Sequence, residues 1–359
     1  MTNNQATKEK FNNLVKNHKA QDVIILAFET SCDETSVAVV RNGREVLSNV
    51  ISSQIDIHAR FGGVVPEVAS RNHLLAIQQV TNQAIEQAGI TLQNIDAIAV
   101  TYGAGLMGAL LVGVSFAKAL AFALDIPLLA VNHIWAHISS SYLVDNTLTH
   151  PYLALVVSGG HTALVKCTKT KKIVLGTTHD DAVGECYDKV AKVLGLSYPG
   201  GPIVDKLAQT GNNNIVFVKK PKDNKNLNFS YSGLKTAVIN HIHSLNQKNI
   251  PIDTADICAS FQHEAIATLV EKCIYAVKKT KIKQLVLAGG VAANSHLRNQ
   301  IQKAAKEHNF KVVIPPLSLC TDNAAMIGVE AYENLKLGRG LAGLDLNADP
   351  SANLKYKKM

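Results

Sequence analysis

One order of predicted elements occurs twice along the chain, and this repeat constrains the fold more than any single motif. Each half begins with three short apolar runs, separated by turn residues, that predict three strands. A helical segment, a strand, a glycine-containing turn followed by a helix, and a last strand come next. In the first half the expected strands are 23–28, 36–40, 45–51, 95–101 and 126–131. In the second half they are 152–157, 163–167, 172–175, 284–287 and 311–314.

Strands that alternate with helices indicate an α/β protein, and the repeat indicates two lobes built on one plan. A chain of 359 residues is long enough for two such lobes. We expect the first lobe at 23–131, completed by a closing helix at 322–345. The second lobe is expected at 132–321, with an insertion near 210–235. The polar segment 1–22 is expected to be a flexible N-terminal extension, and 346–359 a basic tail.

Three glycine-rich turns occur at 103–105, 158–160 and 289–290. Backbone N–H groups at such turns can approach a phosphate or a ribose without a Cβ in the way. Each turn alone is better explained as a tight connection. Their equivalent places in a repeated plan favour a shared nucleotide site.

Two histidines, His133 and His137, follow Asn132, a residue suited to cap a helix. At a spacing of four they share one helix face and can hold one metal ion. Thirteen histidines in 359 residues give about 0.5 such pairs by chance, so the pair needs its surroundings. If the halves pack about a twofold axis, Asp322, which follows the last strand, faces this pair. Two imidazoles and one carboxylate suit Fe(II), and Zn(II) tolerates them.

Composition is that of a globular protein, with 47% apolar and 18% charged residues. Lys and Arg exceed Asp and Glu by 36 to 28, which permits a polyanionic partner such as tRNA without requiring one. The six cysteines contain no CxxC pair, which indicates a reducing compartment. Lys118 and Asp125 interrupt the apolar segment 103–131, so we expect a buried helix and strand and no membrane span. A cytoplasmic location is favoured over a mitochondrial one, because 1–22 contains no Arg.

Nine short motifs together resemble the TsaD family of tRNA threonylcarbamoyladenosine synthases, once called glycoproteases. The matching stretches are 29–35 (ETSCDET), 65–71 (VPEVASR), 132–137 (NHIWAH), 156–162 (VVSGGHT), 188–189 (DK), 198–202 (YPGGP), 231–236 (YSGLKT), 289–294 (GGVAAN) and 321–323 (TDN). Their order and spacing over most of the chain make the resemblance far more specific than any one motif. It implies the duplicated actin-like, ribonuclease H-like fold of sugar kinases and heat-shock ATPases (the ASKHA fold), with a central cleft.

The resemblance also implies a site and an activity. A metal ion, usually iron(II), would be bound by His133, His137 and Asp322. The residues that would hold the adenylate substrate are Val156, Val157, Ser158, Gly159, Gly160, Asp188, Gly201, Asp205 and Asn294. The family transfers a threonylcarbamoyl group from threonylcarbamoyl-AMP to N6 of the adenosine 3′ to the anticodon, in tRNAs that read codons beginning with A.

Similar bacterial proteins work with others. Their partners are a catalytically silent paralogue (TsaB) and a P-loop ATPase (TsaE), while TsaC supplies the adenylate. One departure from the family is Ala104, where Pro is common between the two glycines. We expect the turn to survive this change with less rigidity.

Further roles are hypotheses built on these motifs. Asp188 and Asp205 are expected to accept hydrogen bonds from ribose hydroxyls. Asp33 and Glu34 lie in the first loop, and we hypothesise that Glu34 accepts the N6 proton or orients the acceptor. The alternative is that both residues only cap the loop ends.

Several basic or titratable residues keep two interpretations. His161 either donates to the phosphate or packs the hairpin, and Lys235 either contacts nucleotide or tRNA or is solvated. Two runs of lysine would meet a tRNA backbone, although charge runs are usually solvated surface. They are Lys219, Lys220, Lys222 and Lys225 in the insertion, and Lys355, Lys357 and Lys358 at the end of the chain.

Three other functions fit parts of the sequence. A metal-dependent glycoprotease is disfavoured, because no glutamate lies between His133 and His137, where HExxH enzymes carry the residue that activates water. An ASKHA-type ATPase would position Mg²⁺ through carboxylates and water and seldom uses two histidines. A nucleotide-binding scaffold within a larger assembly would have no turnover of its own.

Overall fold

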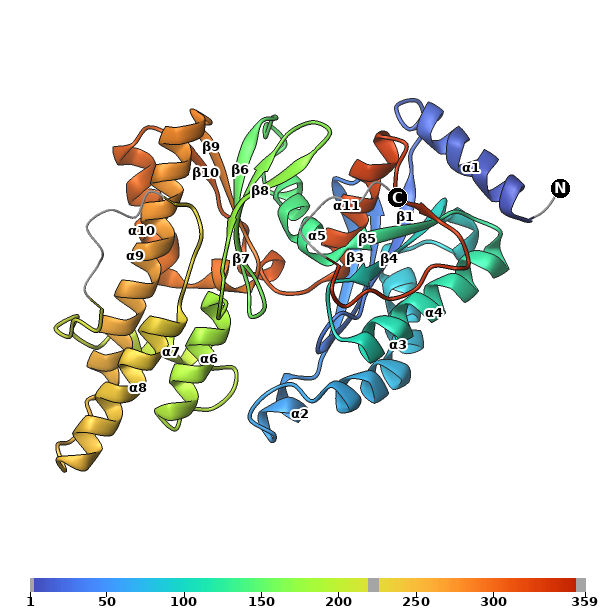
Figure 1. Ribbon diagram of the computed structural model, residues 1–359. Helices are drawn as coiled ribbons and strands as arrows, with labels where there is room; N and C mark the ends of the chain where they lie inside the picture. The colour runs from blue at the N-terminus through green and yellow to red at the C-terminus, as the bar shows by residue number, and fades with distance from the viewer. Residues whose placement is uncertain (1–2, 219–225, 353–359) are drawn as a thin grey trace. The chain divides into compact units, whose positions relative to one another are not determined.

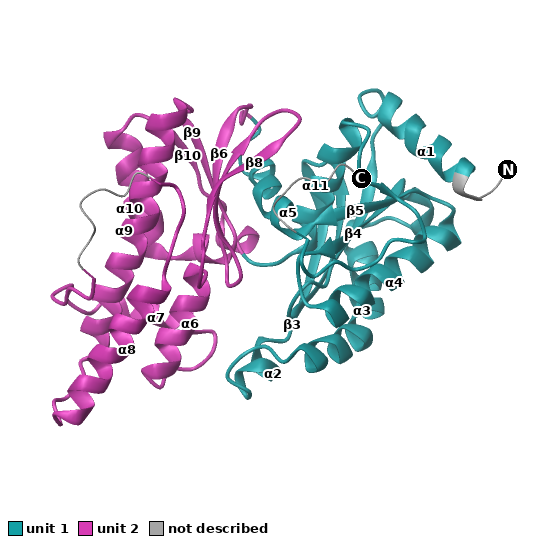
Figure 2. Cartoon of the chain, viewed as in Figure 1, with its two compact units in different colours: residues 1–146, 321–359 teal, residues 147–320 magenta. Residues whose placement is uncertain are grey.

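The structure is a computed structural model of the 359-residue chain, and it describes residues 3–218 and 226–352. The chain forms two compact units, coloured separately in Figure 2. Unit 1 is Met1–Asn146 with Thr321–Met359, and unit 2 is Thr147–Cys320. We had expected the second lobe to begin at 132. Helix α5 (His133–Ser139) belongs instead to unit 1, because it packs against α11 (Ala324–Lys336) of that unit.

Unit 1 contains a six-stranded sheet in the order β11-β5-β4-β1-β2-β3 (Figure 1). The strands are β1 (Ile24–Glu29), β2 (Glu34–Arg41), β3 (Glu45–Ser53), β4 (Ala97–Gly103), β5 (Leu128–Asn132) and β11 (Leu341–Ala342). β1, β4 and β5 are parallel, and β1 to β3 form an antiparallel meander. The expected strands of the first half are therefore confirmed.

Helices cover both faces of this sheet. The α-helices of unit 1 are α1 (Asn3–Asn17), α2 (Ile55–Ala59), α3 (Pro66–Ala88), α4 (Met107–Leu124), α5 and α11, and the 3₁₀ helices are η1 (Leu92–Asn94) and η2 (Ser140–Leu143). Leu26 and Phe28 of β1 enter a core shared with α3 and α4. Ala27, between them, lies next to Gly328 of α11. This alternation along one strand places α11 and the α3–α4 pair on opposite faces.

Residues 3–17 form helix α1, where we expected a flexible extension. Phe11 and Leu14, three positions apart, are buried. Lys10 Nζ lies 2.6 Å from Asp125 Oδ2 at the end of α4, and the hydroxyl of Tyr332 in α11 donates to the carbonyl of His18 at 3.3 Å. Two apolar side chains in a polar segment are a weak periodic signal, so the sequence alone did not reveal this helix.

Helix α4 is the only helix in the described part of the chain that is long and apolar enough to span a membrane by length and composition. Seven of its residues are buried: Ala109, Leu110, Val112, Gly113, Val114, Ala117 and Ala121. Of these, Val112, Val114, Ala117 and Ala121 contribute to the core with β4 and α3. This packing agrees with the expected buried helix at 103–131.

Unit 2 contains a five-stranded sheet in the order β10-β9-β6-β7-β8. Its strands are β6 (Tyr152–Val157), β7 (Thr162–Cys167), β8 (Lys172–Thr177), β9 (Gln284–Ala288) and β10 (Lys311–Val313). Its α-helices are α6 (Val183–Val193), α7 (Gly200–Ala208), α8 (Ser232–Gln247), α9 (Thr254–Thr280) and α10 (Ser295–Glu307), with 3₁₀ helices η3 (Gly290–Ala293) and η4 (Leu317–Leu319). A large apolar core joins β6, β7 and β9 to helices α6, α8, α9 and α10.

The two sheets share one topology, which confirms the repeat. In each sheet a three-stranded antiparallel meander continues through its first strand into two parallel strands, β4 and β5 in unit 1 and β9 and β10 in unit 2. The two lysine runs at 219–225 and 355–358 lie outside the described residues. Of the expected basic tail, 346–352 is described and contains no Lys or Arg.

Candidate functional site

Asn132 ends strand β5 and caps helix α5, as the sequence indicates. Its side-chain Oδ1 accepts hydrogen bonds from the backbone N–H groups of Ile134 and Trp135 at 3.0 and 3.2 Å. All seven residues of α5 are buried. The cap therefore fixes the start of the helix, so that His133 occupies its first position and His137 lies one turn later.

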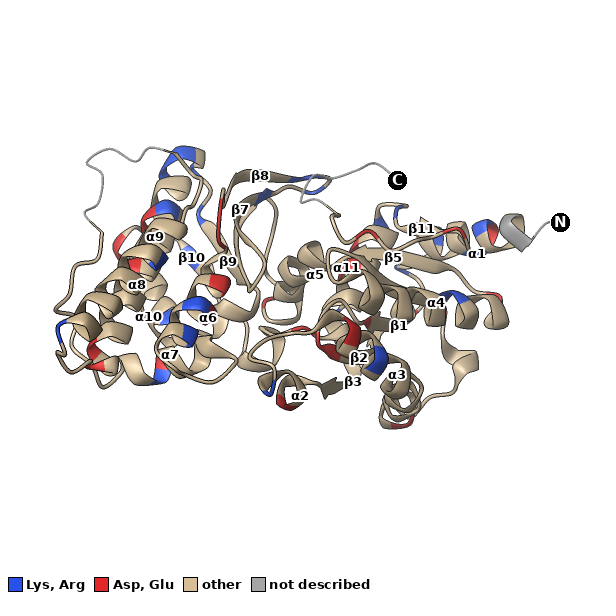
Figure 3. Ribbon diagram, turned by 60° about the horizontal axis from the view of Figure 1, so that its bottom comes forward, with Lys and Arg blue, Asp and Glu red and all other residues tan. Residues whose placement is uncertain are grey.

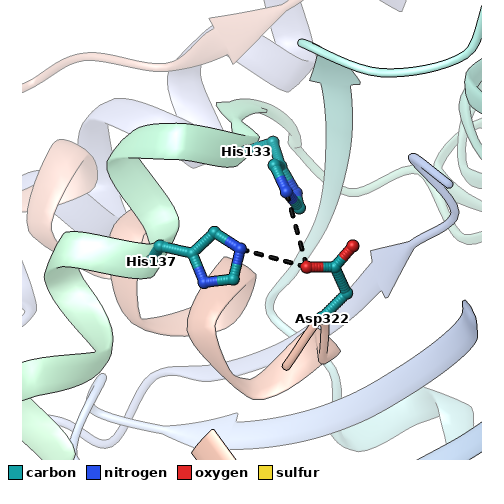
Figure 4. Close-up of side chains that lie close together, drawn as sticks. All are labelled: His133, His137 and Asp322. Carbon is teal, nitrogen blue, oxygen red and sulfur yellow. Dashed lines mark hydrogen bonds and ion pairs between the residues drawn. The ribbon is translucent and has the colours of Figure 1, made fainter. Parts of the chain in front are cut away.

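His133, His137 and Asp322 meet in unit 1 (Figure 4). Oδ1 of Asp322 lies 3.0 Å from Nε2 of His137 and 3.5 Å from Nε2 of His133. The centroids of the two imidazole rings are 4.6 Å apart, and the ring planes are nearly perpendicular, with an angle of 83° between them. One donor atom from each residue lies within 4.8 Å of the others. The predicted convergence of these three side chains is confirmed.

Glu29, to which the sequence analysis assigned no role, lies behind His133. Its Oε2 is 3.1 Å from His133 Nδ1 and accepts a hydrogen bond from Thr101 Oγ1 at 2.7 Å. Its Oε1 accepts from the backbone N–H of Ser31 at 2.5 Å. The side chain is fully buried. A single acid at the end of an apolar strand has no spacing that marks it as functional, although its burial in a strand predicts a partner.

Opposite charges around His133 set its protonation. Burial alone would lower the pKa of His133, but the carboxylates of Asp322 and Glu29 outweigh it and raise this pKa to about 9. Burial would raise the pKa of Glu29, but His133 lowers it below the usual value. The pocket thus favours a positive charge beside Asp322 and Glu29, whether that charge is a proton or a metal ion.

Asp33 and Glu34 lie where the first loop enters β2. Asp33 is buried, and its carbonyl accepts from the backbone N–H of Gln54 at 3.0 Å. Ser53 Oγ donates to Glu34 Oε1 at 3.4 Å. Burial, Asp322 and Asp33 together raise the pKa of Glu34 to about 10. This dependence on Asp322 shows that Glu34 lies within electrostatic range of the histidine cluster.

A buried histidine of α3 holds the loop that carries these acids. His73 Nδ1 lies 2.7 Å from Thr35 Oγ1, and its Nε2 lies 2.9 Å from the carbonyl of Cys32. On the other side, the Ser31 carbonyl accepts from the N–H of Leu106 at 2.8 Å. A Cβ on Gly105 would lie 2.5 Å from that carbonyl, so only glycine fits there. The turn 103–105 therefore fixes the first loop.

The three side chains of the cluster fit a divalent cation. Two imidazole nitrogens and a carboxylate oxygen form a donor set typical of Fe(II) or Zn(II) sites that keep open positions for substrate. The second nitrogen of His133 has a carboxylate partner in Glu29, as is usual for a metal-bound histidine. Asp322 keeps 22% of its side-chain surface accessible. The cluster is thus shielded by protein on the histidine side and open on the side of Asp322.

In unit 2 the glycine turns of the sequence analysis adjoin one another. A Cβ on Gly289, which has φ +91°, would lie 2.5 Å from the carbonyl of Val157. A Cβ on Gly184, at the start of α6, would lie 2.6 Å from the carbonyl of Ser158. Gly159 and Gly290, by contrast, have open space where a Cβ would lie. The turns at 158–160 and 289–290 thus pack together and leave backbone accessible on their open sides.

The polar residues expected to bind the adenylate make internal hydrogen bonds. Asp188 Oδ1 accepts from the N–H of Gly200 at 2.8 Å, at the start of α7. Asp205 accepts from the N–H and the hydroxyl of Ser295 at 3.0 and 2.8 Å. Asn294 caps α10 by accepting from the N–H of Leu297 at 2.9 Å. Val156 and Val157 end β6 beside these turns, and Gly201 lies in the first turn of α7.

Gln262 of α9 connects two of these residues and was not found from the sequence. Its Nε2 donates to Asp205 Oδ1 at 3.0 Å, and its Oε1 accepts from Asn294 Nδ2 at 2.7 Å. The hydroxyl of Tyr187 donates to the same Oε1 at 3.2 Å. A glutamine in the middle of a long helix carries no motif, so sequence reasoning had no signal to use.

Lys235, which kept two interpretations, forms an ion pair. Its Nζ lies 2.6 Å from Asp181 Oδ2, and Lys189 of α6 lies 2.8 Å from the other oxygen of the same carboxylate. Lys235 belongs to α8 and Lys189 to α6, a helix on which Figure 3 shows basic residues in blue. For His161, the backbone closes the hairpin: its N–H donates to Ser158 Oγ and its carbonyl accepts from the Ser158 N–H.

Comparison with known proteins gives consistent matches. The family model described as TsaD, tRNA N6-adenosine threonylcarbamoyltransferase, matches residues 45–329. A Clostridium novyi protein of that name is 53% identical over 338 residues, which cover 93% of this chain and 99% of the relative. A Staphylococcus aureus protein of the same name is 50% identical over 336 residues, covering 93% and 98%.

Solved structures of distant proteins share the fold. HypF from T. kodakarensis superposes with a TM-score of 0.60 at 15% identity, covering 88% of this chain and 48% of that one. Component A of (R)-2-hydroxyglutaryl-CoA dehydratase from Acidaminococcus fermentans gives 0.52 at 13% identity, covering 87% and 99%. At this level of identity the likeness concerns the fold alone, and it agrees with the expected duplicated ASKHA architecture.

Proposed function

Because the chain belongs to the TsaD family of tRNA N6-adenosine threonylcarbamoyltransferases, we propose that it modifies tRNA by the reaction that gives the family its name. It transfers the threonylcarbamoyl group of threonylcarbamoyl-AMP to N6 of the adenosine 3′ to the anticodon, in tRNAs that read codons beginning with A. The observation that carries the proposal is the family match over 45–329, a range that includes two buried histidines and a partly exposed carboxylate gathered in one cluster.

The reaction has a simple balance. The N6 amine forms a bond to the carbamoyl carbon, the bond between that carbon and the phosphate oxygen breaks, and AMP leaves with the electron pair. N6 loses one proton. The amine is a weak nucleophile and the carbonyl is stabilised by resonance, so the protein must orient both and stabilise the leaving phosphate.

We assign the cation to unit 1. His133 and His137 would bind it through Nε2 and Asp322 through a carboxylate oxygen, with iron(II) favoured and zinc(II) the alternative. When bound, such an ion supplies a Lewis acid that polarises substrate oxygens. The burial of α5 and its cap at Asn132 keep the two imidazoles fixed, so that little reorganisation is needed on binding.

We assign the adenylate to unit 2. The backbone of Ser158, Gly159 and Gly160 would face the phosphate, together with the open side of Gly290. The carboxylates of Asp188 and Asp205 each accept hydrogen bonds from groups within unit 2. These bonds fix the carboxylates, so that their remaining lone pairs are oriented to accept from ribose hydroxyls. Asn294 is held by its helix cap in the same way, so these side chains present a prearranged surface.

Glu34 is our candidate for the group that accepts the N6 proton or orients the acceptor, with Asp33 beside it. In the protein without a cation, a pKa of about 10 keeps Glu34 protonated at neutral pH. A cation held by Asp322 would counter the charge that raises this pKa and would favour the carboxylate. Loading of the cluster would therefore prepare Glu34 to accept a proton.

Partners and location follow from the family. We propose tRNA and threonylcarbamoyl-AMP as substrates, a TsaB-like paralogue and a TsaE-like P-loop ATPase as protein partners, and a TsaC-like enzyme as the source of the adenylate. We propose that the protein works in the cytoplasm, where tRNA is modified, without a membrane partner.

Transfer in a purified system tests the proposal. Protein loaded with Fe(II) under anaerobic conditions, with the paralogue and ATPase added, is incubated with threonylcarbamoyl-AMP that contains labelled threonine. The acceptor is unmodified tRNA, and the control tRNA has guanosine in place of the target adenosine. We expect label only in the first tRNA, and its loss with Glu34→Gln. Hydrolysis of ATP by this protein alone, without labelled tRNA, would favour the ATPase, and cleavage of glycoprotein would favour the protease.

A further inference from the structure

Glu29 is a buried carboxylate at the C-terminal end of β1, and the reaction proposed above does not require it to touch substrate. Its side chain is 0% exposed, and its two oxygens have three partners within unit 1: the N–H of Ser31, the hydroxyl of Thr101 and the imidazole of His133. A charge without solvent is retained only where its partners compensate the lost hydration. Two of these partners are ordinary polar groups of the scaffold, and the third is a residue of the cluster.

The geometry at His133 is directional. Glu29 Oε2 lies 3.1 Å from Nδ1, and Asp322 Oδ1 lies 3.5 Å from Nε2, on the opposite edge of the ring. A carboxylate only accepts hydrogen bonds, so Glu29 requires a proton on Nδ1. The neutral imidazole that meets this requirement has its lone pair on Nε2, which faces Asp322 and His137.

The two histidines of the cluster differ in this respect. His137 also directs Nε2 to Asp322, at 3.0 Å, but its buried Nδ1 has no hydrogen-bond partner in the described residues. The tautomer and orientation of His137 are therefore set by packing and by Asp322. Only His133 has a second carboxylate behind it, which makes Glu29 the residue that distinguishes the two ligands.

We propose that Glu29 is a positioning residue for the cation site: it holds His133 in the tautomer whose Nε2 can bind a metal ion. Ser31 and Thr101 hold the carboxylate itself in place, one on each oxygen. Ser31 Oγ lies 3.2 Å from the same Nδ1 and adds a weaker polar neighbour. This inference rests on the cation site of the proposed function, but it does not depend on the identity of the acceptor.

Replacement by glutamine gives a sharp test because it keeps the shape and removes the charge. The amide oxygen of Glu29→Gln can still accept from Ser31, which turns the amide NH₂ towards Thr101 and His133. That NH₂ donates to Nδ1, so it favours the wrong tautomer, with the proton on Nε2. Thr101→Val is the matched comparison, since it removes one donor that holds the same carboxylate but keeps the charge beside His133, so its effect on the cation site should be smaller.

The full-length chain and both variants are titrated with Zn²⁺ in competition with a chelator, and with Co²⁺, whose visible absorption reports its ligands. We expect Glu29→Gln to raise the dissociation constant for Zn²⁺ about 10- to 100-fold and to alter the Co²⁺ spectrum. Thr101→Val should change the constant less than about threefold. Thermal unfolding of the metal-free proteins shows whether each variant is folded.

Three outcomes would overturn the inference: a Zn²⁺ affinity of Glu29→Gln equal to that of wild type, an equal loss in Thr101→Val, or no binding of either ion by wild type. If Glu29→Gln is unfolded, Glu29→Asp replaces it, because it keeps the charge but shortens the reach, and it must then weaken Zn²⁺ binding for the inference to stand. These titrations contain no tRNA. A failure of the transfer reaction would therefore leave their outcome unchanged, and the two proposals fail separately.

Discussion

Nε2 of His137 lies 3.0 Å from Oδ1 of Asp322, although 185 positions of sequence separate the two residues. The contact exists because α11, the closing helix that follows Asp322, returns to the sheet of unit 1 and packs against α5. Asn323 caps α11 by accepting a hydrogen bond from the N–H of Met326 at 3.1 Å. This cap fixes where the helix begins and thereby the position of Asp322, the residue just before it. Two caps, Asn132 and Asn323, thus position the three side chains of the cluster.

Removal of a cluster residue should abolish tight cation binding and leave the fold intact. Asp322→Ala or His137→Ala removes one of three donors, so we expect the dissociation constant for Zn²⁺ to rise more than about 100-fold, beyond the effect of a residue that only supports a ligand. Calorimetric titration in competition with a chelator measures this dissociation constant. Lys303→Ala, at an exposed position of α10, serves as control and should bind as wild type. Unchanged affinity in Asp322→Ala would show that the ion is held elsewhere.

Cation affinity should depend on pH through His133. Asp322 and Glu29 outweigh burial and raise its pKa to about 9, so at pH 7 the metal-free protein holds a proton that the ion must displace. We expect Zn²⁺ affinity to rise about tenfold per pH unit from pH 7 to about 9 and then to level. A flat profile over this range would contradict the assignment of His133 as a ligand.

As the pH rises, the free energy of unfolding of the metal-free protein should fall, whereas the Zn²⁺ affinity should increase. A folded pKa above the unfolded value of 6.5 stabilises the folded state fully below about pH 6.5, and this contribution is lost as the pH rises through about 9. Denaturation with urea in the presence of a chelator, at pH 6 and at pH 9.5, measures this difference. His133→Ala should reduce it.

The adjacent glycine turns of unit 2 allow fold and ligand binding to be separated. Gly289→Ala places a Cβ 2.5 Å from the carbonyl of Val157 at a φ of +91°, so it should destabilise the protein by about 1–3 kcal/mol. Gly290→Ala has open space and should change stability by less than about 0.5 kcal/mol, yet weaken AMP binding if the phosphate lies against that face. Urea unfolding and AMP titration measure both. Equal stability of the two variants would contradict the turn packing.

Gln262 should matter for both the stability of unit 2 and its nucleotide. Gln262→Leu removes one buried hydrogen-bond partner from each of Asp205 and Asn294, so we expect a loss of about 1–3 kcal/mol in the free energy of unfolding and weaker AMP binding. Urea unfolding gives the first value and calorimetry the second. Gln302→Leu makes the same replacement at an exposed position of α10 and should do neither. Wild-type AMP binding in Gln262→Leu would remove Asp205 and Asn294 from the proposed site.

Much of this architecture could be predicted from the sequence because local signals agreed with the fold. The cap at Asn132, the helical spacing of His133 and His137, and the repeated order of strands each indicated one structure. The boundary between units was wrong because a helix after a strand gives no sign of the sheet it will pack on. Helix α1 was missed for a similar reason, since it packs against α11 and its Phe11 and Leu14 are buried only in the tertiary structure.

Residues that act through others were the hardest to find. Gln262 and His73 belong to no motif, and Glu29 begins the stretch 29–35 without a role of its own there; the importance of all three arises from contacts with residues far along the chain. The family resemblance implied roles for Asp188 and Asp205, but their internal hydrogen bonds with Gly200 and Ser295 depend on tertiary structure. Sequence motifs thus led to the candidate site, and the structure adds the contacts that hold its residues in position.

Nucleoside analysis of tRNA tests the central claim most directly. Cells depleted of this protein are supplied with wild type, with Asp322→Ala or with the exposed control Lys303→Ala, and threonylcarbamoyladenosine is measured by mass spectrometry in digested tRNA. The modified nucleoside should fall on depletion, return with wild type and with the control, and stay low with Asp322→Ala. An unchanged level after depletion, or full recovery with Asp322→Ala, would contradict the account.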